Sequence, residues 1–176
     1  RSTPVRRRFP KLTVSRTDAR SQVLIAPPGL LRALPPASLG AVGIVYALAR
    51  LGKAKGNEHA LEQARTLWYE KVAPAPITHG ADVITGAAGA IPILLQLEGC
   101  VDSTSITDCV RRLASKIASS ALHTADGVCW RGTSIAVRPL TGCAHGASGY
   151  AYALLAAWLR TGVAEYFYLA HQALLY

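Results

Sequence analysis

The sequence predicts an all-α protein made of repeated helix pairs, arranged as part of an α/α toroid, which is a double-layered barrel of such pairs. A four-residue motif, Gly-Ala-x-Gly, occurs three times, at residues 40–43, 86–89 and 146–149. An apolar run follows each of these tetrads, and a segment of mixed polarity follows each run. A unit that recurs in this way along a chain is the signature of a repeat architecture.

The apolar runs predict the inner helices of the array. They span residues 44–51, 90–97 and 150–159 and contain hardly a charged residue. A helix that is apolar on all sides is buried in its protein. Because an open solenoid leaves one face of every helix in water, helices as apolar as these favour the closed toroid.

The segments of mixed polarity predict the outer helices. They cover residues 58–72, 105–122 and 163–176, each after a short break that contains glycine. Three- and four-residue steps between apolar residues predict an amphipathic helix with one buried face. In the second segment these residues are Ile106, Cys109, Val110, Leu113 and Ile117. Each unit is therefore expected to hold one inner and one outer helix.

The spacing of the tetrads predicts an insertion between the second and third units. The first glycines lie 46 residues apart between the first two copies and 60 residues apart between the last two. The additional length falls at about residues 124–142, where Gly127, Gly132, Pro139 and Gly142 are typical of turns. We expect a loop there.

Composition limits the class of protein. The chain has 176 residues, of which 51% are hydrophobic, enough for one domain, but it has no methionine and begins at Arg1, so we expect a fragment. No apolar run reaches the roughly 18 to 20 residues of a membrane helix, and no secretory signal stands at the start. The four cysteines (Cys100, Cys109, Cys129 and Cys143) form no paired spacing, which predicts reduced thiols in a cytoplasmic protein.

The basic charge is concentrated in residues 1–37, ahead of the repeats. The net charge of the chain is +9, of which residues 1–20 carry +6. We interpret residues 1–37 as a solvated basic arm or as the end of a preceding region, with residues 38–176 as the repeat domain. Binding of an acidic peptide or of nucleic acid by the arm is the alternative.

Chemistry is expected where the copies of the repeat differ. Asp82 stands four residues before its tetrad and His145 one residue before its own, where the first copy has Pro36 and Leu39. Equivalent positions of a toroid lie on one rim, so both side chains should face one cavity. Since adjacent helices pack about 8–10 Å apart, we expect them on either side of a bound group. Free N–H groups at the inner-helix ends should suit an anion or a developing enolate.

Structural interpretations of the same residues remain open. Asp82 could be only a helix cap, and His145 could be a buried histidine bonded to a carbonyl group. Cys143 and His145 could supply two metal ligands, although no second pair follows at the spacing of a zinc finger. The glycines are expected to allow helix backbones to approach closely.

Five further residues have weaker predicted roles. His79 could orient Asp82 from three residues upstream, and Trp130-Arg131 could line the mouth of the cavity. Trp68 and Trp158 fall within apolar helical patterns and are predicted to be packing residues.

Three ordered stretches of the chain resemble the lanthionine synthetase C-like cyclases. They are residues 38–48, residues 82–91, which begin Asp-Val-Ile-Thr-Gly, and residues 139–149, which end His-Gly-Ala-Ser-Gly. With Trp130-Arg131 between the last two, they most resemble the C-terminal cyclase domain of bifunctional class II lanthipeptide synthetases. The resemblance covers residues 38–176. It implies a toroid of about seven helix pairs, of which this chain would hold the first three.

The resemblance also implies a reaction and its participants. Members of the family close thioether rings in a precursor peptide by adding a cysteine thiol to dehydroalanine or dehydrobutyrine, with zinc activating the thiol. His145 matches the family's active-site histidine, an acid or base, and Asp82 matches its acidic position. The family's zinc ligands are expected after Tyr176, so neither zinc nor activity is expected of this fragment alone. Cys143 stands where an aromatic residue is expected. The resemblance implies a cytoplasmic enzyme whose partner is a peptide, and it implies neither nucleic acid binding nor insertion into a membrane.

Other classes of protein compete with this interpretation. A glycoside hydrolase or a terpenoid cyclase on an α/α toroid would need paired catalytic carboxylates or an Asp-rich metal motif, but Asp82 is the only acid expected at the mouth of an inner helix. A non-catalytic helical scaffold that binds peptides, or a decayed cyclase, remains the alternative. Replacing His145 separates them, because only a cyclase would lose ring closure.

Overall fold

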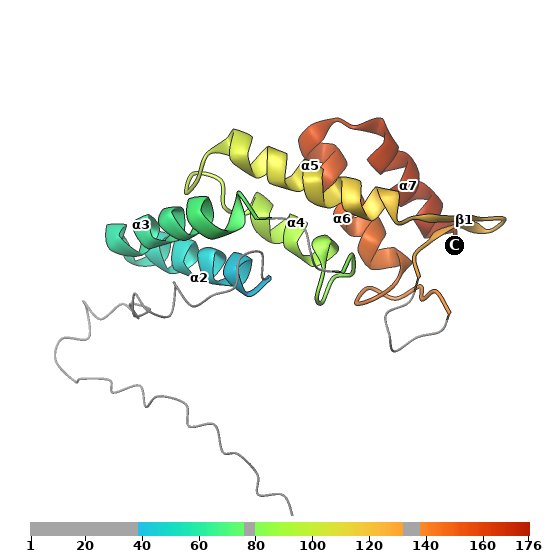
Figure 1. Cartoon of the computed structure of the whole chain (residues 1–176), viewed down its shortest axis with the longest axis horizontal. Coiled ribbons are helices and arrows are strands. Elements are labelled where there is room, and N and C mark those ends of the chain that lie inside the picture. Colours follow the sequence, from blue (N-terminus) through green and yellow to red (C-terminus); the bar gives the residue numbers. More distant parts are fainter. Residues whose placement is uncertain (1–38, 76–79, 132–137) are drawn as a thin grey trace, which may run out of the picture.

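A computed structural model describes residues 39–75, 80–131 and 138–176 (Figure 1). The predicted basic arm at residues 1–37 and His79 lie outside the described residues. The helices are α2 (Leu39–Lys55), α3 (Glu58–Leu67), which continues as the π-helix η1 (Trp68–Val72), α4 (Ala87–Leu95), α5 (Ser103–Ser119), α6 (Ala147–Thr161) and α7 (Ala164–Leu175). Two short strands, β1 (Leu122–Thr124) and β2 (Gly127–Cys129), form an antiparallel hairpin.

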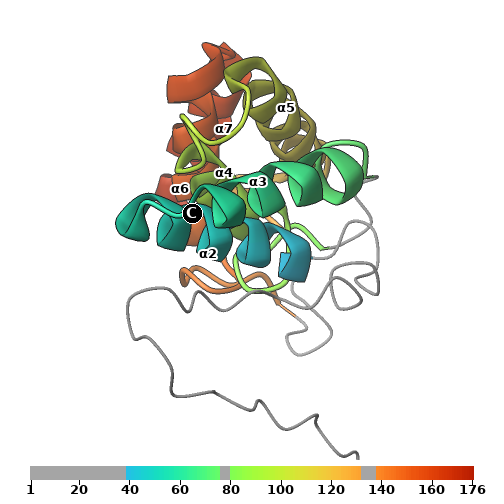
Figure 2. The same cartoon turned by 90° about the vertical axis from the view of Figure 1, so that its left-hand side faces the viewer.

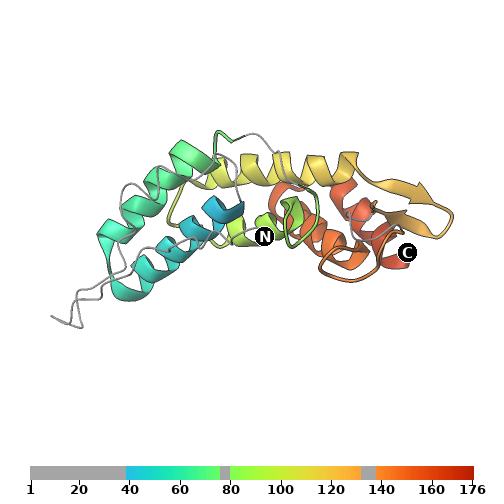
Figure 3. The same ribbon diagram turned by 60° about the horizontal axis from the view of Figure 1, so that its bottom comes forward.

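The helices form two curved layers of paired elements. Helices α2, α4 and α6 lie side by side in one layer, and α3, α5 and α7 cover them in the other (Figures 1 and 3). Each inner helix packs against the outer helix that follows it, and Figure 2 shows α3 lying over α2. The prediction of an all-α array with one inner and one outer helix per unit is confirmed.

Complete burial of an inner helix occurs only in the middle of the array. Helix α4 contacts both α2 and α6, and none of its residues is exposed. Helix α6 leaves Tyr152 and Leu159 59% and 76% exposed, and α2 leaves Leu51 45% exposed. The prediction that all three inner helices are buried on every side is therefore wrong for α2 and α6, because each has an inner neighbour on one side only among the described residues.

The outer helix α5 is amphipathic, as its apolar spacing predicts. Four of the five predicted positions are buried, and Leu113 is partly buried against the core. Trp68 is fully buried and its indole N–H donates to Ser105 Oγ at 2.9 Å, which joins the start of η1 to the start of α5. Trp158 packs against Phe167 with the ring centroids 4.8 Å apart. The packing roles predicted for these two tryptophans are confirmed.

The insertion before the third tetrad begins as a β-hairpin rather than as the predicted loop. Gly127 begins β2 directly after the turn at residues 125–126, with a φ of +136°, a backbone conformation that favours glycine. A Cβ on Gly127 would lie 2.4 Å from the carbonyl oxygen of Gln172, so the hairpin fits closely against the end of α7. The turn residues are what the composition indicates, but they connect strands of three residues, too short for a clear alternation of apolar and polar side chains.

All four cysteines are free thiols, and Cys143 is the one that is exposed. Burial raises the pKa of the Cys100 and Cys109 thiols. No helix in the described part of the chain is long and apolar enough to cross a membrane.

Candidate functional site

The loops that precede α4 and α6 have the same backbone hydrogen bonds. In both, the first two N–H groups of the helix donate to carbonyl groups seven residues earlier. The bonds are Ala87 to Gly80 (2.9 Å) and Ala88 to Ala81 (3.0 Å) at α4, and Ala147 to Leu140 (2.8 Å) and Ser148 to Thr141 (3.1 Å) at α6. These helix ends are therefore closed by the loops themselves. The expectation that their N–H groups are free for an anion is wrong, because the chain folds back over each helix end.

This folding back explains the glycines of the second and third tetrads. An added Cβ would approach a carbonyl oxygen of the preceding loop at 1.9 to 2.4 Å at all four positions. The pairs are Gly86 with Gly80, Gly89 with Val83, Gly146 with Leu140 and Gly149 with Cys143. Glycine thus permits close approach as predicted, but mainly of a loop to its own helix rather than of one helix to another.

The two loops also contact each other. The N–H of Val83 donates to the carbonyl oxygen of Ala144 at 3.1 Å. The Cγ2 atom of Val83 would lie 2.6 Å from a Cβ added to Gly149. The ends of α4 and α6 are therefore joined at this rim, and side chains from the two loops come within reach of one another.

Asp82 is the only polar or charged residue among the described residues that is classed as buried, with 3% of its surface exposed. Its Oδ1 accepts the N–H of Thr85 at 2.6 Å, and the Thr85 hydroxyl donates to Oδ2 at 3.1 Å. The interpretation of Asp82 as a helix cap is wrong, because residues 83–85 form a turn and α4 begins at Ala87 with Gly86 as its N-cap. Asp102, which does cap α5, makes a side-chain bond of the same spacing to the N–H of Ser105 at 2.7 Å while it is exposed. A bond of this kind therefore does not explain why Asp82 is buried.

His145 reaches across from the other loop to Asp82. Its Nδ1 lies 3.5 Å from Asp82 Oδ2, too far for a strong hydrogen bond. This nitrogen is buried and has no hydrogen-bond partner in the described residues, so it bonds to no carbonyl group there. The side chain as a whole is 29% exposed, which leaves Nε2 as the nitrogen able to meet a substrate.

The contact corrects the expected separation of the two residues. We expected them on either side of a bound group because helix axes pack several ångströms apart. Both side chains instead extend from loops that meet through the bond between Val83 and Ala144. The copies do place Asp82 and His145 on one rim, as predicted, but as a contacting pair.

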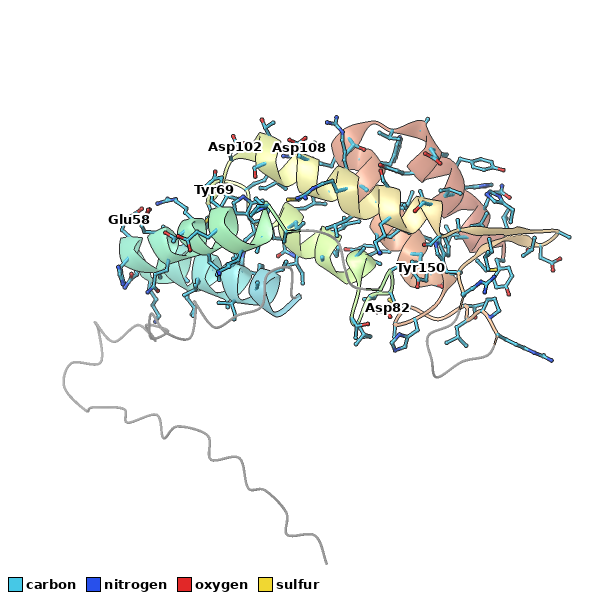
Figure 4. The ribbon with its side chains drawn as sticks, viewed as in Figure 1. Glu58, Tyr69, Asp82, Asp102, Asp108 and Tyr150 are labelled. Carbon is cyan, nitrogen blue, oxygen red and sulfur yellow. The ribbon has the colours of Figure 1, made fainter. Side chains whose placement is uncertain are left out.

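A pocket of about 460 Å³ opens beside Asp82. It lies between the end of α5, the hairpin, the Asp82 loop and the first turn of α6. Its lining is Gly80, Ala81, Asp82, Ser119, Ser120, Ala121, Leu122, Trp130, Arg131 and Tyr150. Trp130 and Arg131 line a cavity as predicted. Figure 4 shows Asp82 and Tyr150 near each other at the lower ends of α4 and α6, whereas Asp102 and Asp108 lie at the far end of α5.

Tyr150 is an aromatic residue of the pocket that the sequence analysis did not identify. It is 4% exposed, and its ring stacks on Trp130 with the centroids 4.4 Å apart. Burial raises the pKa of Tyr150 to about 12, with a further contribution from the charge of Asp82. A comparison of the copies could have identified it, because the residues four positions after the first glycine are Ile44, Ala90 and Tyr150, and only the third is aromatic.

A family model described as lanthionine synthetase C-like protein matches residues 30–176. The chain belongs to the lanthionine synthetase C-like family. No match was found among curated proteins or among solved structures. Family membership indicates a function like that of a lanthionine synthetase and a peptide as the class of substrate, and the three helix pairs are part of the family's α/α toroid.

The zinc ion that the lanthionine synthetase C-like family implies does not fit the described residues. Nowhere in residues 39–75, 80–131 and 138–176 do three His, Cys, Asp or Glu side chains gather as a metal site would require. Cys143 and His145 accordingly form no metal site with a third ligand there. The chemistry that these residues can carry out is proton transfer by His145, with Asp82 beside it.

Proposed function

We propose that this chain is the proton-transfer part of a cyclase that forms lanthionine rings in a ribosomally made precursor peptide. The contact between His145 and Asp82, made across two repeat loops in a chain of this family, is the observation that carries the proposal. The reaction adds a cysteine thiol of the peptide to dehydroalanine or dehydrobutyrine. Within the family, the chain is proposed to belong to the cyclase region of a class II lanthipeptide synthetase.

His145 would deliver the proton that completes the addition. When sulfur bonds to the β-carbon of the dehydrated residue, the electrons of the C=C bond move toward the carbonyl group, and the α-carbon then takes up a proton. The Asp82 carboxylate faces Nδ1, so it favours the tautomer that carries hydrogen there. Nε2 is then free to take a proton and return it. The carboxylate also stabilises the imidazolium that forms in between.

Asp82 is suited to orient His145 because its own position is determined by other contacts. Thr85 supplies two donors to the carboxylate, and burial excludes water from around it. A buried carboxylate favours an opposite charge more strongly than a solvated one does. The zinc of the family is proposed to be held by ligands that follow Tyr176 and would lower the pKa of the attacking thiol.

The test uses the complete protein with a dehydrated precursor peptide. Ring closure changes no mass, so free peptide thiols are counted by alkylation and mass spectrometry over time. We expect His145→Ala to slow ring closure by about 10²- to 10⁴-fold, the usual contribution of a general acid or base. Asp82→Asn, which keeps an oxygen for the N–H of Thr85, should slow it by about 10-fold or more.

Asp102→Asn is the matched control, because Asp102 also accepts the N–H of the residue three positions later, at the start of α5 and far from the pair. It should leave the rate unchanged. Full ring closure by His145→Ala, in a protein whose wild type closes rings, would refute the proposed role. A wild type that binds the peptide and never closes a ring would favour the peptide-binding scaffold.

A further inference from the structure

The pocket beside Asp82 has an unused hydrogen-bond donor in it. The hydroxyl of Tyr150 makes no hydrogen bond to any described residue, although the side chain is 4% exposed and lines the pocket. Tyr166, buried to the same extent at 3%, pairs its hydroxyl with Ser115 Oγ at 3.1 Å. In the described residues the buried polar side-chain atoms without a partner are Gln63 Oε1 and His145 Nδ1, and the Tyr150 hydroxyl is not among them. It therefore opens into the pocket that the residue lines, where it can bond to a ligand.

The ring of Tyr150 is positioned by contacts that do not involve its hydroxyl. It stacks on Trp130 with an angle of 21° between the planes. The Trp130 indole N–H in turn donates to the carbonyl oxygen of Ile117 at 2.8 Å, in a buried setting near the end of α5. A chain of contacts from α5 through Trp130 therefore holds the phenol in the pocket before any ligand arrives.

This phenol acts as a donor over the whole physiological pH range. With a pKa of about 12 it keeps its proton, because burial and the charge of Asp82 disfavour the phenolate. A proton donor held in a partly apolar pocket is suited to an oxygen atom that gains negative charge. At about 460 Å³ the pocket is large enough for a small ligand or a short stretch of peptide.

The two aromatic residues of the pocket belong to the third unit and its insertion, whereas Asp82 and the end of α5 come from the second unit. Tyr150 replaces Ala90 and Ile44 of the other copies, and Trp130 comes from the insertion that lengthens the third unit. The loop contacts that close the helix ends, by contrast, occur before both α4 and α6. By the same reasoning that singled out Asp82 and His145, residues particular to one copy are the candidates for chemistry.

On the basis of the proposed function, we infer that this pocket is the subsite for the dehydrated residue of the peptide and that the Tyr150 hydroxyl donates a hydrogen bond to its carbonyl oxygen. As the thiol sulfur bonds to the β-carbon, the electrons of the C=C bond move onto that oxygen. Tyr150 stabilises the enolate without giving up its proton. His145 then donates a proton to the α-carbon, the carbonyl group re-forms, and the thiol proton that was lost balances the one gained.

Tyr150→Phe tests the hydrogen bond, because it keeps the ring that stacks on Trp130. In the complete protein we expect ring closure to slow by about 100-fold, as when one donor to an oxyanion is lost, with an unchanged melting temperature. Tyr166→Phe is the control: it should lower the melting temperature and keep the wild-type rate. A wild-type rate for Tyr150→Phe, or a slower rate accompanied by a melting temperature as low as that of Tyr166→Phe, would overturn the inference.

A binding measurement separates this inference from the proposed function. The probe is N-acetyldehydroalanine amide, and the readout is the fluorine NMR signal of Trp130 in protein labelled with 5-fluorotryptophan, assigned with Trp130→Phe. We expect the probe to shift this signal in the wild type and to bind several-fold more weakly to Tyr150→Phe. No shift, or equal binding by both, overturns the subsite. If the probe shifts the signal but the protein never closes rings, the proposed subsite is supported and the proposed cyclase function is rejected.

Discussion

The loop before α4 and the loop before α6 share a backbone and differ in the side chains that it presents. In both, two loop carbonyl groups accept hydrogen bonds from the first two N–H groups of the helix seven residues later. Both loops require glycine at the first and fourth residues of the tetrad. Yet the first presents Asp82 and Thr85 where the second presents Gly142 and His145. The difference shows that the tetrads fix the backbone of the two loops, which we call the frame. One loop then carries a carboxylate and its neighbour carries an imidazole.

The largest difference between the loops should appear at Thr85 and His145, which occupy equivalent positions. His145→Thr gives the second loop the residue of the first. Ring closure should fall by about 10²- to 10⁴-fold with little change in stability, because His145 Nδ1 makes no hydrogen bond among the described residues. Thr85→Ala should instead destabilise the fold by about 2 kcal/mol, since the buried carboxylate loses a hydroxyl donor.

Ring-closure rates and chemical denaturation measure these two effects. We assign a structural role to Thr85 and a role in the reaction to His145. If both variants mainly lost stability, or both mainly lost activity, this assignment would be wrong.

The stability of the frame should be equally sensitive to substitution of the tetrad glycines in both loops. Gly89→Ala and Gly149→Ala each place a Cβ 1.9 Å from a loop carbonyl oxygen, and each should destabilise the protein by about 3 kcal/mol. Gly43→Ala is the control, because a Cβ there meets nothing within 4 Å and alanine favours helix by up to about 1 kcal/mol. Denaturant unfolding of the three variants tests this, and tolerance of alanine at only one of the two loops would show that the frames are not equivalent.

The smallest effect is expected where one loop has a bond that the other lacks. The Ser148 hydroxyl donates to the carbonyl oxygen of Thr141 at 2.6 Å, and the equivalent residue in the other copy is Ala88. Ser148→Ala should cost about 0.5 to 1 kcal/mol of stability and leave ring closure at the wild-type rate. A large loss of activity in this variant would mean that the exposed hydroxyl meets the substrate.

The sequence predicted the architecture because each level of it repeats. The tetrads, the apolar runs and the amphipathic segments all indicated helix pairs in two layers. The hairpin was missed because its strands have three residues each, although Asp126-Gly127 is a pair typical of tight turns. The exposure of Tyr152 and Leu159 was missed because it depends on which neighbours an inner helix has, not on its own composition.

The candidate site was predictable in identity and not in geometry. Differences between copies identified Asp82 and His145, but the distance between them depends on loops that fold back over helix ends, and helix spacing says nothing about loops. The occupied N–H groups at α4 and α6 were missed for the same reason. Tyr150 stood within a run expected to be core, where an aromatic residue gives no separate signal until the pocket beside it is seen.

The central claim is that His145 and Asp82 act as one unit across the two loops, and a double-mutant cycle tests it most directly. Ring-closure rates are compared for the wild type, Asp82→Asn, His145→Ala and the double variant in the complete protein. If Asp82 acts through His145, the double variant should be about as slow as His145→Ala alone. A double variant slowed by the product of the two single effects would show that the residues act independently and would contradict the account.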